Sequence, residues 1–349
     1  MRAMVLERFN EPLQLRDLPV PAVGPGDLLV KVKVCSVCGT DLKIKAGKIP
    51  TVPLPLIPGH EIAGEIVKLG AGAACEEFKV GDRVTFPIYI TCGQCLNCKR
   101  GQYTVCLNSI KRLGFELNGG FAEYMVAPAD NAVKIPDGIS YAEAALVPDA
   151  IATSLHAFND RIKVAPGENV LILGAGGLGI HGVQVAKALG ATVSVADLDD
   201  RKLAITKQLG ADYTFNTGTM DLVEECKKVT GGYGMDVVGE YVGVSATSEL
   251  GVKCLRMAGT MVMLGYAPGT EFKVSSMDIA MGERVIIGSR AMTKQNVIDT
   301  LRMVAQRKVI PQIEQEFMLE DVNTVMDKLA TTGFMGRGIL IIDQELWTS

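Results

Sequence analysis

Hydrophobic positions follow two different patterns along the chain, and the change falls near residue 150. Before it, short β-branched runs such as 27–34 and 61–69 alternate with proline and glycine turn signals. This pattern predicts a β-rich region. From about residue 165, apolar runs of strand length, beginning with 170–173, alternate with glycine-rich turns and helical stretches. Such alternation predicts βαβ units and a parallel sheet.

The C-terminal part of the chain returns to a mixed pattern. Amphipathic helical patterns cover 292–307 and 319–329, and the apolar run GRGILIID follows at 336–343. We expect this tail to fold back on the first region. The predicted organisation is one domain built from 1–150 and 289–349 and a second from 151–288.

Length and composition restrict the classes of function. The chain has 349 residues, of which 48% are hydrophobic and 21% charged, and its formal net charge is −4. These values are typical of an ordinary globular protein and lack the basic excess of a nucleic-acid-binding protein. We therefore expect a small-molecule substrate and copies of the same chain as partners, and no nucleic acid.

No targeting or membrane segment is visible in the sequence. The first fifteen residues carry early charges and lack the apolar core of a secretory signal. No apolar stretch approaches the roughly 18 to 20 residues that cross a bilayer. We therefore expect a cytoplasmic protein without membrane contact. In a reducing compartment, its nine cysteines are better explained by metal binding or catalysis than by disulfides.

A glycine-rich motif stands where a dinucleotide site requires it, between an apolar run and a helical stretch. Such glycines allow a tight turn and a close backbone approach to a pyrophosphate at a helix N-terminus. Asp197 ends the next predicted strand, where an acid would accept hydrogen bonds from the adenosine ribose. Its charge would repel a 2′-phosphate by roughly 1 to 4 kcal/mol, which favours NAD over NADP. The motif residues are Gly174, Gly176, Gly177, Leu178 and Gly179.

Four cysteines fall within fifteen residues, in the pattern C-x2-C-x2-C-x7-C. Four thiolates can close a tetrahedral shell around zinc and leave no position for a substrate, so this spacing predicts a structural zinc. The intervening residues are mostly polar, which argues against a set of buried free thiols. The predicted lobe spans about 91–107, and its ligands are Cys92, Cys95, Cys98 and Cys106.

The order of the motifs resembles that of the zinc-containing medium-chain dehydrogenases/reductases, the zinc-dependent alcohol dehydrogenase family. The shared series is CGTD, GHE, the four-cysteine pattern, GGFAEY, GxGxxG followed by an aspartate, and a late GR, and it covers nearly the whole chain. The resemblance implies an α/β protein. Its two parts would be a GroES-like β-rich catalytic domain and a Rossmann domain with a doubly wound parallel sheet.

The resemblance also implies a second, catalytic zinc, giving two per chain. Spacing alone does not single out Cys38 and His60, but by the resemblance they are zinc ligands. The third ligand position holds Asp149 where alcohol dehydrogenase has a cysteine. This replaces a soft sulfur with a hard oxygen and is similar to bacterial secondary-alcohol dehydrogenases, which favours secondary, cyclic or polyol alcohols. Glu61 resembles the family's mobile carboxylate, which binds zinc transiently.

Further roles are implied by matching positions. Thr40 resembles the first station of the family's proton path, and Lys43 stands where many relatives have a histidine relay. A lysine relays protons only when its pKa is lowered, so Lys43 is either a relay or a solvated cation. Asp41 resembles the acid that orients the zinc site. Arg337 is similar to the family arginine that contacts the cofactor pyrophosphate.

Two other functions are compatible with parts of this pattern. A zinc-free reductase of the same superfamily would reduce an enone or acyl-CoA double bond with NADPH, but it needs neither zinc site. A noncatalytic module that binds zinc and nucleotide would lack turnover. Relatives are dimers or tetramers, so the resemblance implies a homodimer or homotetramer, with 284–288 as the candidate edge strand.

Overall fold

The computed structural model describes residues 1–73, 77–108 and 111–346, and the chain divides into two compact units. The first unit comprises Met1–Ala152, Ala291–Arg307 and Ile313–Ser349, and the second comprises Thr153–Arg290 and Lys308–Gln312. In the described residues, none of the helices combines the length and apolar character that a membrane-crossing helix requires.

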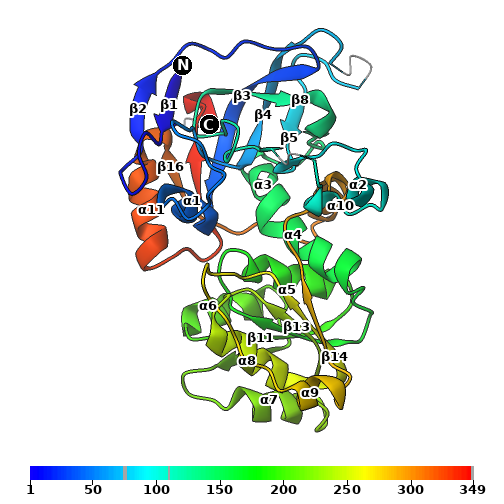
Figure 1. Cartoon of the computed structure of the whole chain (residues 1–349). Coiled ribbons are helices and arrows are strands. Elements are labelled where there is room, and N and C mark those ends of the chain that lie inside the picture. The colour runs from blue at the N-terminus through cyan, green and yellow to red at the C-terminus, as the bar shows by residue number, and fades with distance from the viewer. Residues whose placement is uncertain (74–76, 109–110, 347–349) are drawn as a thin grey trace. The chain divides into compact units, whose positions relative to one another are not determined.

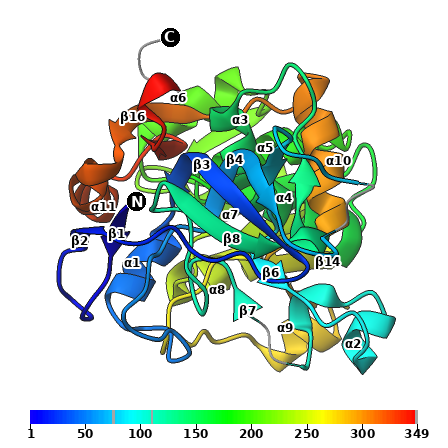
Figure 2. The same ribbon diagram turned by 90° about the horizontal axis from the view of Figure 1, so that it is seen from above.

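The first unit is built on a seven-stranded sheet. Its strands run in the order β16-β17-β3-β4-β5-β9, and β8 pairs with β3. The longest strand, β3, is almost entirely buried and pairs with β4, β8 and β17; Figure 2 shows β3, β4 and β8 together. The strands are β3 Asp27–Val37, β4 Glu61–Leu69, β5 Arg83–Thr85, β8 Tyr124–Pro128, β9 Val133–Lys134, β16 Ile313–Met318 and β17 Arg337–Ile341.

Short helices and two small strand pairs complete this unit. A capping box starts α3, because the Ser140 hydroxyl accepts from Glu143 N–H and the Glu143 carboxylate accepts from Ser140 N–H. Directly after α3, one π-helical turn at Val147–Ile151 follows. The remaining elements are β1 Arg2–Val5, β2 Gln14–Asp17, α1 Gly39–Lys45, β6 Tyr89–Ile90, α2 Leu96–Lys99, β7 Lys111–Arg112, α3 Tyr141–Leu146, α10 Lys294–Ala305 and α11 Val322–Thr331.

The second unit contains a six-stranded parallel sheet in the order β12-β11-β10-β13-β14-β15. The order reverses between β10 and β13, the point at which doubly wound sheets bind nucleotides. Helices α5 to α8 pack against this sheet (Figure 1). The elements are β10 Asn169–Leu173, α5 Gly179–Ala188, β11 Thr192–Asp197, α6 Asp200–Gln208, β12 Tyr213–Asn216, α7 Leu222–Val229, β13 Met235–Glu240, α8 Ser245–Cys254, β14 Leu255–Met263, α9 Ser276–Ala280 and β15 Val285–Gly288.

One segment groups differently from the expected domain boundaries. Lys308–Gln312 was expected in the domain that contains the C-terminal tail, but it belongs to the second unit. Two side chains of α5 hold it there: the Gln184 amide exchanges two hydrogen bonds with the backbone of Ile310, and Gln312 N–H donates to His181 Nε2. The sequence pattern of this short stretch carries no sign of these contacts.

Candidate active site

Cys38, His60, Glu61 and Asp149 lie together in the first unit, and each offers a ligand atom within 4.8 Å of the others. Cys38 precedes α1, His60 and Glu61 stand at the start of β4, and Asp149 lies in the π-helical turn after α3. The Cys38 Sγ lies 3.3 Å from Asp149 Oδ2, and His60 Nε2 lies 3.7 Å from the same oxygen. Thiolate, imidazole and carboxylate are the donors that zinc prefers, so the cluster fits a zinc ion.

Asp41 orients two members of this cluster. It is fully buried; one carboxylate oxygen accepts from Cys38 N–H at 2.9 Å, and the other lies 3.1 Å from His60 Nδ1. Because a carboxylate only accepts, His60 donates through Nδ1, and Nε2 is left to face Cys38 and Asp149. The predicted role of Asp41 therefore has a geometric basis.

The ionisation of the cluster couples cation binding to the release of protons. Burial raises the pKa of the Cys38 thiol, although the guanidinium of Arg337 opposes this. Burial would also raise the pKa of Asp149, but His60 and Arg337 outweigh it and hold that pKa well below its usual value. Burial disfavours the imidazolium of His60, yet the nearby carboxylates raise its pKa. A metal cation would thus compete with protons for Cys38 and His60.

Arg337 belongs to this cluster as well, at the first position of β17. Its guanidinium donates to the Glu61 carboxylate at 2.7 Å through Nη2, and Nη2 lies 3.6 Å from both the Cys38 sulfur and Asp149 Oδ2. Arg337 is 5% exposed, and Glu61 is fully buried. In this structure Arg337 therefore pairs with the Glu61 carboxylate, whereas the family resemblance implied contact with the cofactor pyrophosphate. Contact between Arg337 and a cofactor stays a prediction.

The two candidate proton-path residues both belong to α1. The Thr40 hydroxyl lies 3.7 Å from the Cys38 sulfur, next to the donor cluster. The ammonium of Lys43 is half-buried, and this burial lowers the pKa of Lys43. Both observations are compatible with a relay, which remains a prediction.

The four-cysteine lobe has the geometry of a closed metal site. Its Sγ–Sγ distances include 3.5 Å for Cys92–Cys106, 3.8 Å for Cys95–Cys106 and 4.0 Å for Cys92–Cys98. A tetrahedron with Zn–S bonds of about 2.3 Å requires sulfurs about 3.8 Å apart. Backbone N–H groups of Cys98 and Leu107 point at the Cys95 sulfur and lower the pKa of Cys95 to about 6, which favours the thiolate. The lobe fits the predicted structural zinc.

In the second unit, the glycine-rich turn lies at the carboxyl end of β10. Gly174 has φ +94°, and a Cβ on Gly179 would lie 1.9 Å from the Gly174 carbonyl oxygen, so only glycine fits there. A Cβ on Gly176 would meet nothing within 4 Å, which leaves its backbone open to a ligand. Asp197 ends β11 and accepts from Ala175 N–H at 2.7 Å. The turn and the acid are thus brought together as expected, while Gly177 and Leu178 lead into α5.

Two charged side chains beside this acid are tied to each other. The Arg201 guanidinium donates to the Asp199 carboxylate at 2.7 Å, and Arg201 N–H donates to the same group. Arg201 holds the pKa of Asp199 down to about 2. This pairing reduces the ability of Arg201 to attract a 2′-phosphate.

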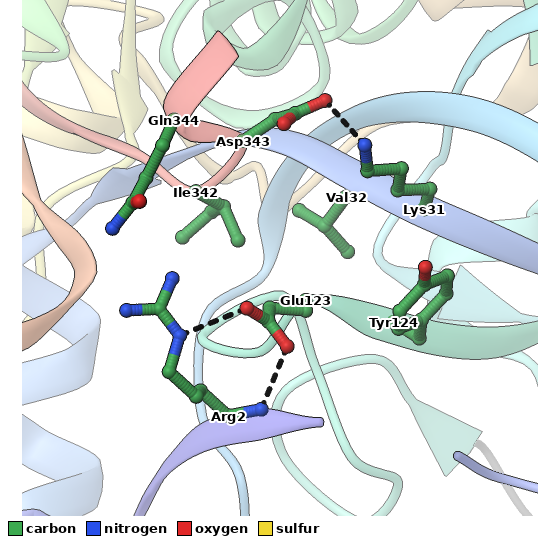
Figure 3. Close-up of a pocket in the computed structure, with 8 residues that line it drawn as sticks. All are labelled: Arg2, Lys31, Val32, Glu123, Tyr124, Ile342, Asp343 and Gln344. Atoms are coloured by element: carbon green, nitrogen blue, oxygen red, sulfur yellow. Dashed lines mark hydrogen bonds and ion pairs between the residues drawn. The ribbon is translucent and has the colours of Figure 1, made fainter. Parts of the chain in front are cut away.

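A hollow of about 220 Å³ also opens on the first unit, and its lining includes none of the donor-cluster residues (Figure 3). Its acids and bases pair with each other: Arg2 donates to Glu123 at 2.9 Å, and Lys31 contacts Asp343 at 2.8 Å. Neutralised pairs leave no unbalanced charge to bind an ion, and the lining holds neither cysteine nor histidine. This hollow is therefore not a candidate for the chemistry.

Two features of the donor cluster were missed by sequence reasoning. The pairing of Arg337 with Glu61 joins residues that are 276 positions apart. The Phe115 ring lies against the His60 ring with a centroid distance of 5.2 Å. No spacing rule links either pair, since both contacts arise only in the folded chain, the first through strand β17 and the second through the turn that holds Phe115.

With this geometry in place, comparison with known proteins identifies the family. Residues 24–137 match the alcohol dehydrogenase GroES-like domain, and residues 177–306 match the zinc-binding dehydrogenase family. An alcohol dehydrogenase of Geobacillus stearothermophilus is 40% identical, over 98% of this chain and 100% of the relative.

Solved structures agree with this result. A crystal structure of an NAD-dependent alcohol dehydrogenase has a TM-score of 0.92 at 30% identity and covers 98% of this chain and 100% of that one. Acetophenone reductase from Geotrichum candidum in complex with NAD has a TM-score of 0.86 at 30% identity and covers 98% and 97%. This chain belongs to the zinc-dependent alcohol dehydrogenase family of the medium-chain dehydrogenases/reductases, and the predicted fold of a GroES-like domain with a Rossmann domain is confirmed.

Proposed function

We propose that this NAD-dependent alcohol dehydrogenase oxidises a secondary, cyclic or polyol alcohol reversibly to its ketone or aldehyde, at a zinc held by Cys38, His60 and Asp149. The observation that carries the proposal is the convergence of these three donors from separate elements, with Asp41 locking the His60 ring. Glu61 is the fourth, transient ligand. Cys92, Cys95, Cys98 and Cys106 hold the second, structural zinc.

The mechanism divides the work between two bound groups and the chain's own side chains. When bound, zinc lowers the pKa of a hydroxyl as a Lewis acid, and NAD accepts the hydride. Cys38 and Asp149 bring two negative charges to the cation, and Asp41 keeps His60 Nε2 directed at it. Thr40 would accept the hydroxyl proton while giving its own proton to the neutral amine of Lys43, whose pKa burial lowers, and Lys43 would release that proton to water. When the cation is not bound to Glu61, Arg337 keeps the Glu61 carboxylate paired.

Two observations support a secondary alcohol. Asp149 supplies a hard oxygen where alcohol dehydrogenase has a cysteine sulfur, and this ligand set resembles that of bacterial secondary-alcohol dehydrogenases. Acetophenone, named in one similar structure, is a ketone whose reduction product is a secondary alcohol. Both observations favour a substrate whose hydroxyl-bearing carbon is bonded to two other carbons.

The direct test combines metal analysis with a substrate panel. We expect two zinc ions per chain and NADH formation from secondary and cyclic alcohols, polyols or hydroxyacyl thioesters, measured by absorbance. Primary alcohols as the preferred substrates would contradict the substrate class. One zinc and no turnover would instead favour a noncatalytic module, and NADPH-dependent reduction of an enone without zinc would favour the zinc-free reductase.

The choice of NAD is tested at Asp197. In Asp197→Asn, the side chain still accepts from Ala175 N–H but loses the charge that repels a 2′-phosphate. We expect the ratio of kcat/KM for NADP to that for NAD to rise about 10-fold, within the roughly 1 to 4 kcal/mol of that repulsion. Asp236→Asn is the matched control, because Asp236 also accepts from a backbone N–H, that of Asn169, but at the amino end of β10 and so at the sheet edge opposite the glycine turn. An equal change in both variants would contradict the assignment of Asp197.

We also propose that copies of the chain associate as a homodimer or homotetramer through β15. This strand has one neighbour, β14, and so leaves an open sheet edge. Exposed apolar side chains occur in β15 itself, in the short stretch before it and in the neighbouring strand β14, namely Val285, Met277, Met281 and Met257. A cytoplasmic location is proposed on the cysteine chemistry alone, since a thiolate-rich metal site suits a reducing compartment.

A further inference from the structure

We propose that Arg112 and Phe115 are positioning residues for the catalytic metal, because the Phe115 ring packs against the His60 imidazole and the Arg112 guanidinium packs over Phe115. This inference deepens the proposed function and rests on it. Its starting point is the Phe115 ring, which is 5% exposed and lies 5.2 Å from the His60 ring at an interplanar angle of 51°.

The imidazole can be disturbed in two ways, and the structure blocks both. Rotation within the ring plane is limited by Asp41, which holds Nδ1 at 3.1 Å. Tilting out of the plane is limited by Phe115, whose ring meets the His60 ring at 51°, between the stacked and the edge-to-face arrangements. Asp41 and Phe115 therefore restrain complementary motions of the same ligand.

Phe115 is itself covered by a charged group. The Arg112 guanidinium lies over its ring at 4.2 Å from the centroid, a cation–π arrangement, and also faces the Tyr89 ring at 5.9 Å. The Glu116 carboxylate accepts twice from the Arg112 side chain, and the Thr51 hydroxyl lies 2.6 Å from Glu116 and 2.9 Å from Arg112. Arg112 is therefore fixed in one position over the ring.

The same stretch of chain also holds the backbone of His60. Gly120 N–H donates to the Gly59 carbonyl oxygen at 2.9 Å. A Cβ on Gly119 would lie 2.0 Å from that oxygen, and one on Gly114 would lie 2.6 Å from it. Residues 112–120 thus meet His60 through both its backbone and its ring. A segment with this double contact is suited to fixing the direction of Nε2.

The test measures zinc retention as well as activity. Wild type, Phe115→Leu and Arg112→Met are loaded with zinc and mixed with a chromophoric chelator, and zinc release is followed in time. We expect one zinc per chain to leave about 10 to 100 times faster in both variants, the usual cost of removing support around a metal ligand. Thiol titration identifies the site, because losing the catalytic zinc frees one thiol, Cys38, whereas losing the structural zinc frees four.

The matched control is Arg83→Met. Arg83 lies over the Tyr141 ring at 4.5 Å in the same unit and contacts none of the proposed ligands. We expect its zinc release to equal that of wild type. Equal release in all four proteins, or an equal acceleration in Arg83→Met, would overturn the positioning role alone. Wild type that holds only the four-thiolate zinc would overturn the proposed function together with this inference.

Discussion

Asp149→Ala is expected to lose one of two zinc ions per chain and to lower kcat/KM about 1,000-fold or more. Asp149 lies 3.3 Å from the Cys38 sulfur and 3.7 Å from His60 Nε2, so its removal leaves a cation with two permanent ligands, Cys38 and His60, beside the transient Glu61, and with one negative charge fewer. A Lewis acid is worth several kcal/mol to this reaction, and about 4 kcal/mol corresponds to 1,000-fold. Zinc content by mass spectrometry and initial rates of NADH formation measure the two effects.

Two further variants sharpen this result. Asp149→Cys keeps an anionic ligand of the kind zinc favours, so we expect two zinc ions and most of the activity to remain. Asp160→Ala removes another aspartate beside a histidine, His156, in the second unit, and should change neither zinc content nor rate by more than a few-fold. Full zinc content in Asp149→Ala would show that Asp149 is not a ligand.

The second large effect is expected for Cys98→Ser. In the lobe, the three cysteines Cys95, Cys98 and Cys106 are buried and pack with one another and with Cys92. Metal binding supplies roughly 10 kcal/mol or more to small sites of this kind. Losing the ion should therefore lower the apparent melting temperature by about 10 °C or more and leave one zinc per chain. Differential scanning calorimetry and metal analysis provide the measurements.

Proteolysis adds a local readout to this experiment. Loss of the ion should expose the stretch 91–107 to cleavage first, because its fold depends on the shared ligand. The control is Cys226→Ala, which alters a buried cysteine in the core of the second unit and should keep two zinc ions. A Cys98→Ser protein with wild-type melting temperature and one missing zinc would mean that the lobe is stable without metal.

The relation between sequence and fold differs from element to element. The run 61–69 predicted β4 with the same bounds. The apolar stretch 170–173 lies within β10, because a parallel strand that is buried on both faces keeps a nearly continuous hydrophobic sequence. The helical pattern at 292–307 was nearly as informative, with α10 at Lys294–Ala305. The return of Lys308–Gln312 to the second unit was not predictable, since it depends on the Gln184 amide meeting one backbone segment.

The candidate sites also differ in how much of their geometry the sequence predicts. The glycine turn and the cysteine lobe are local: their atoms come from short stretches, so spacing along the chain determines distance in space. Cys38, His60 and Asp149 are spread over 111 positions, and only resemblance to a family connected them before the fold was known. Phe115 had no sequence signal, because an aromatic residue after a glycine is common in turns.

By itself, the sequence determined the two kinds of domain, the four-thiolate lobe and the nucleotide turn, because each is encoded by periodicity or by residues a few positions apart. Tertiary structure alone decided that Arg337 pairs with Glu61 and that the Phe115 ring lies against the His60 ring. These contacts join strands and turns distant in the chain. Their geometry follows from sheet register and burial, which no local pattern records.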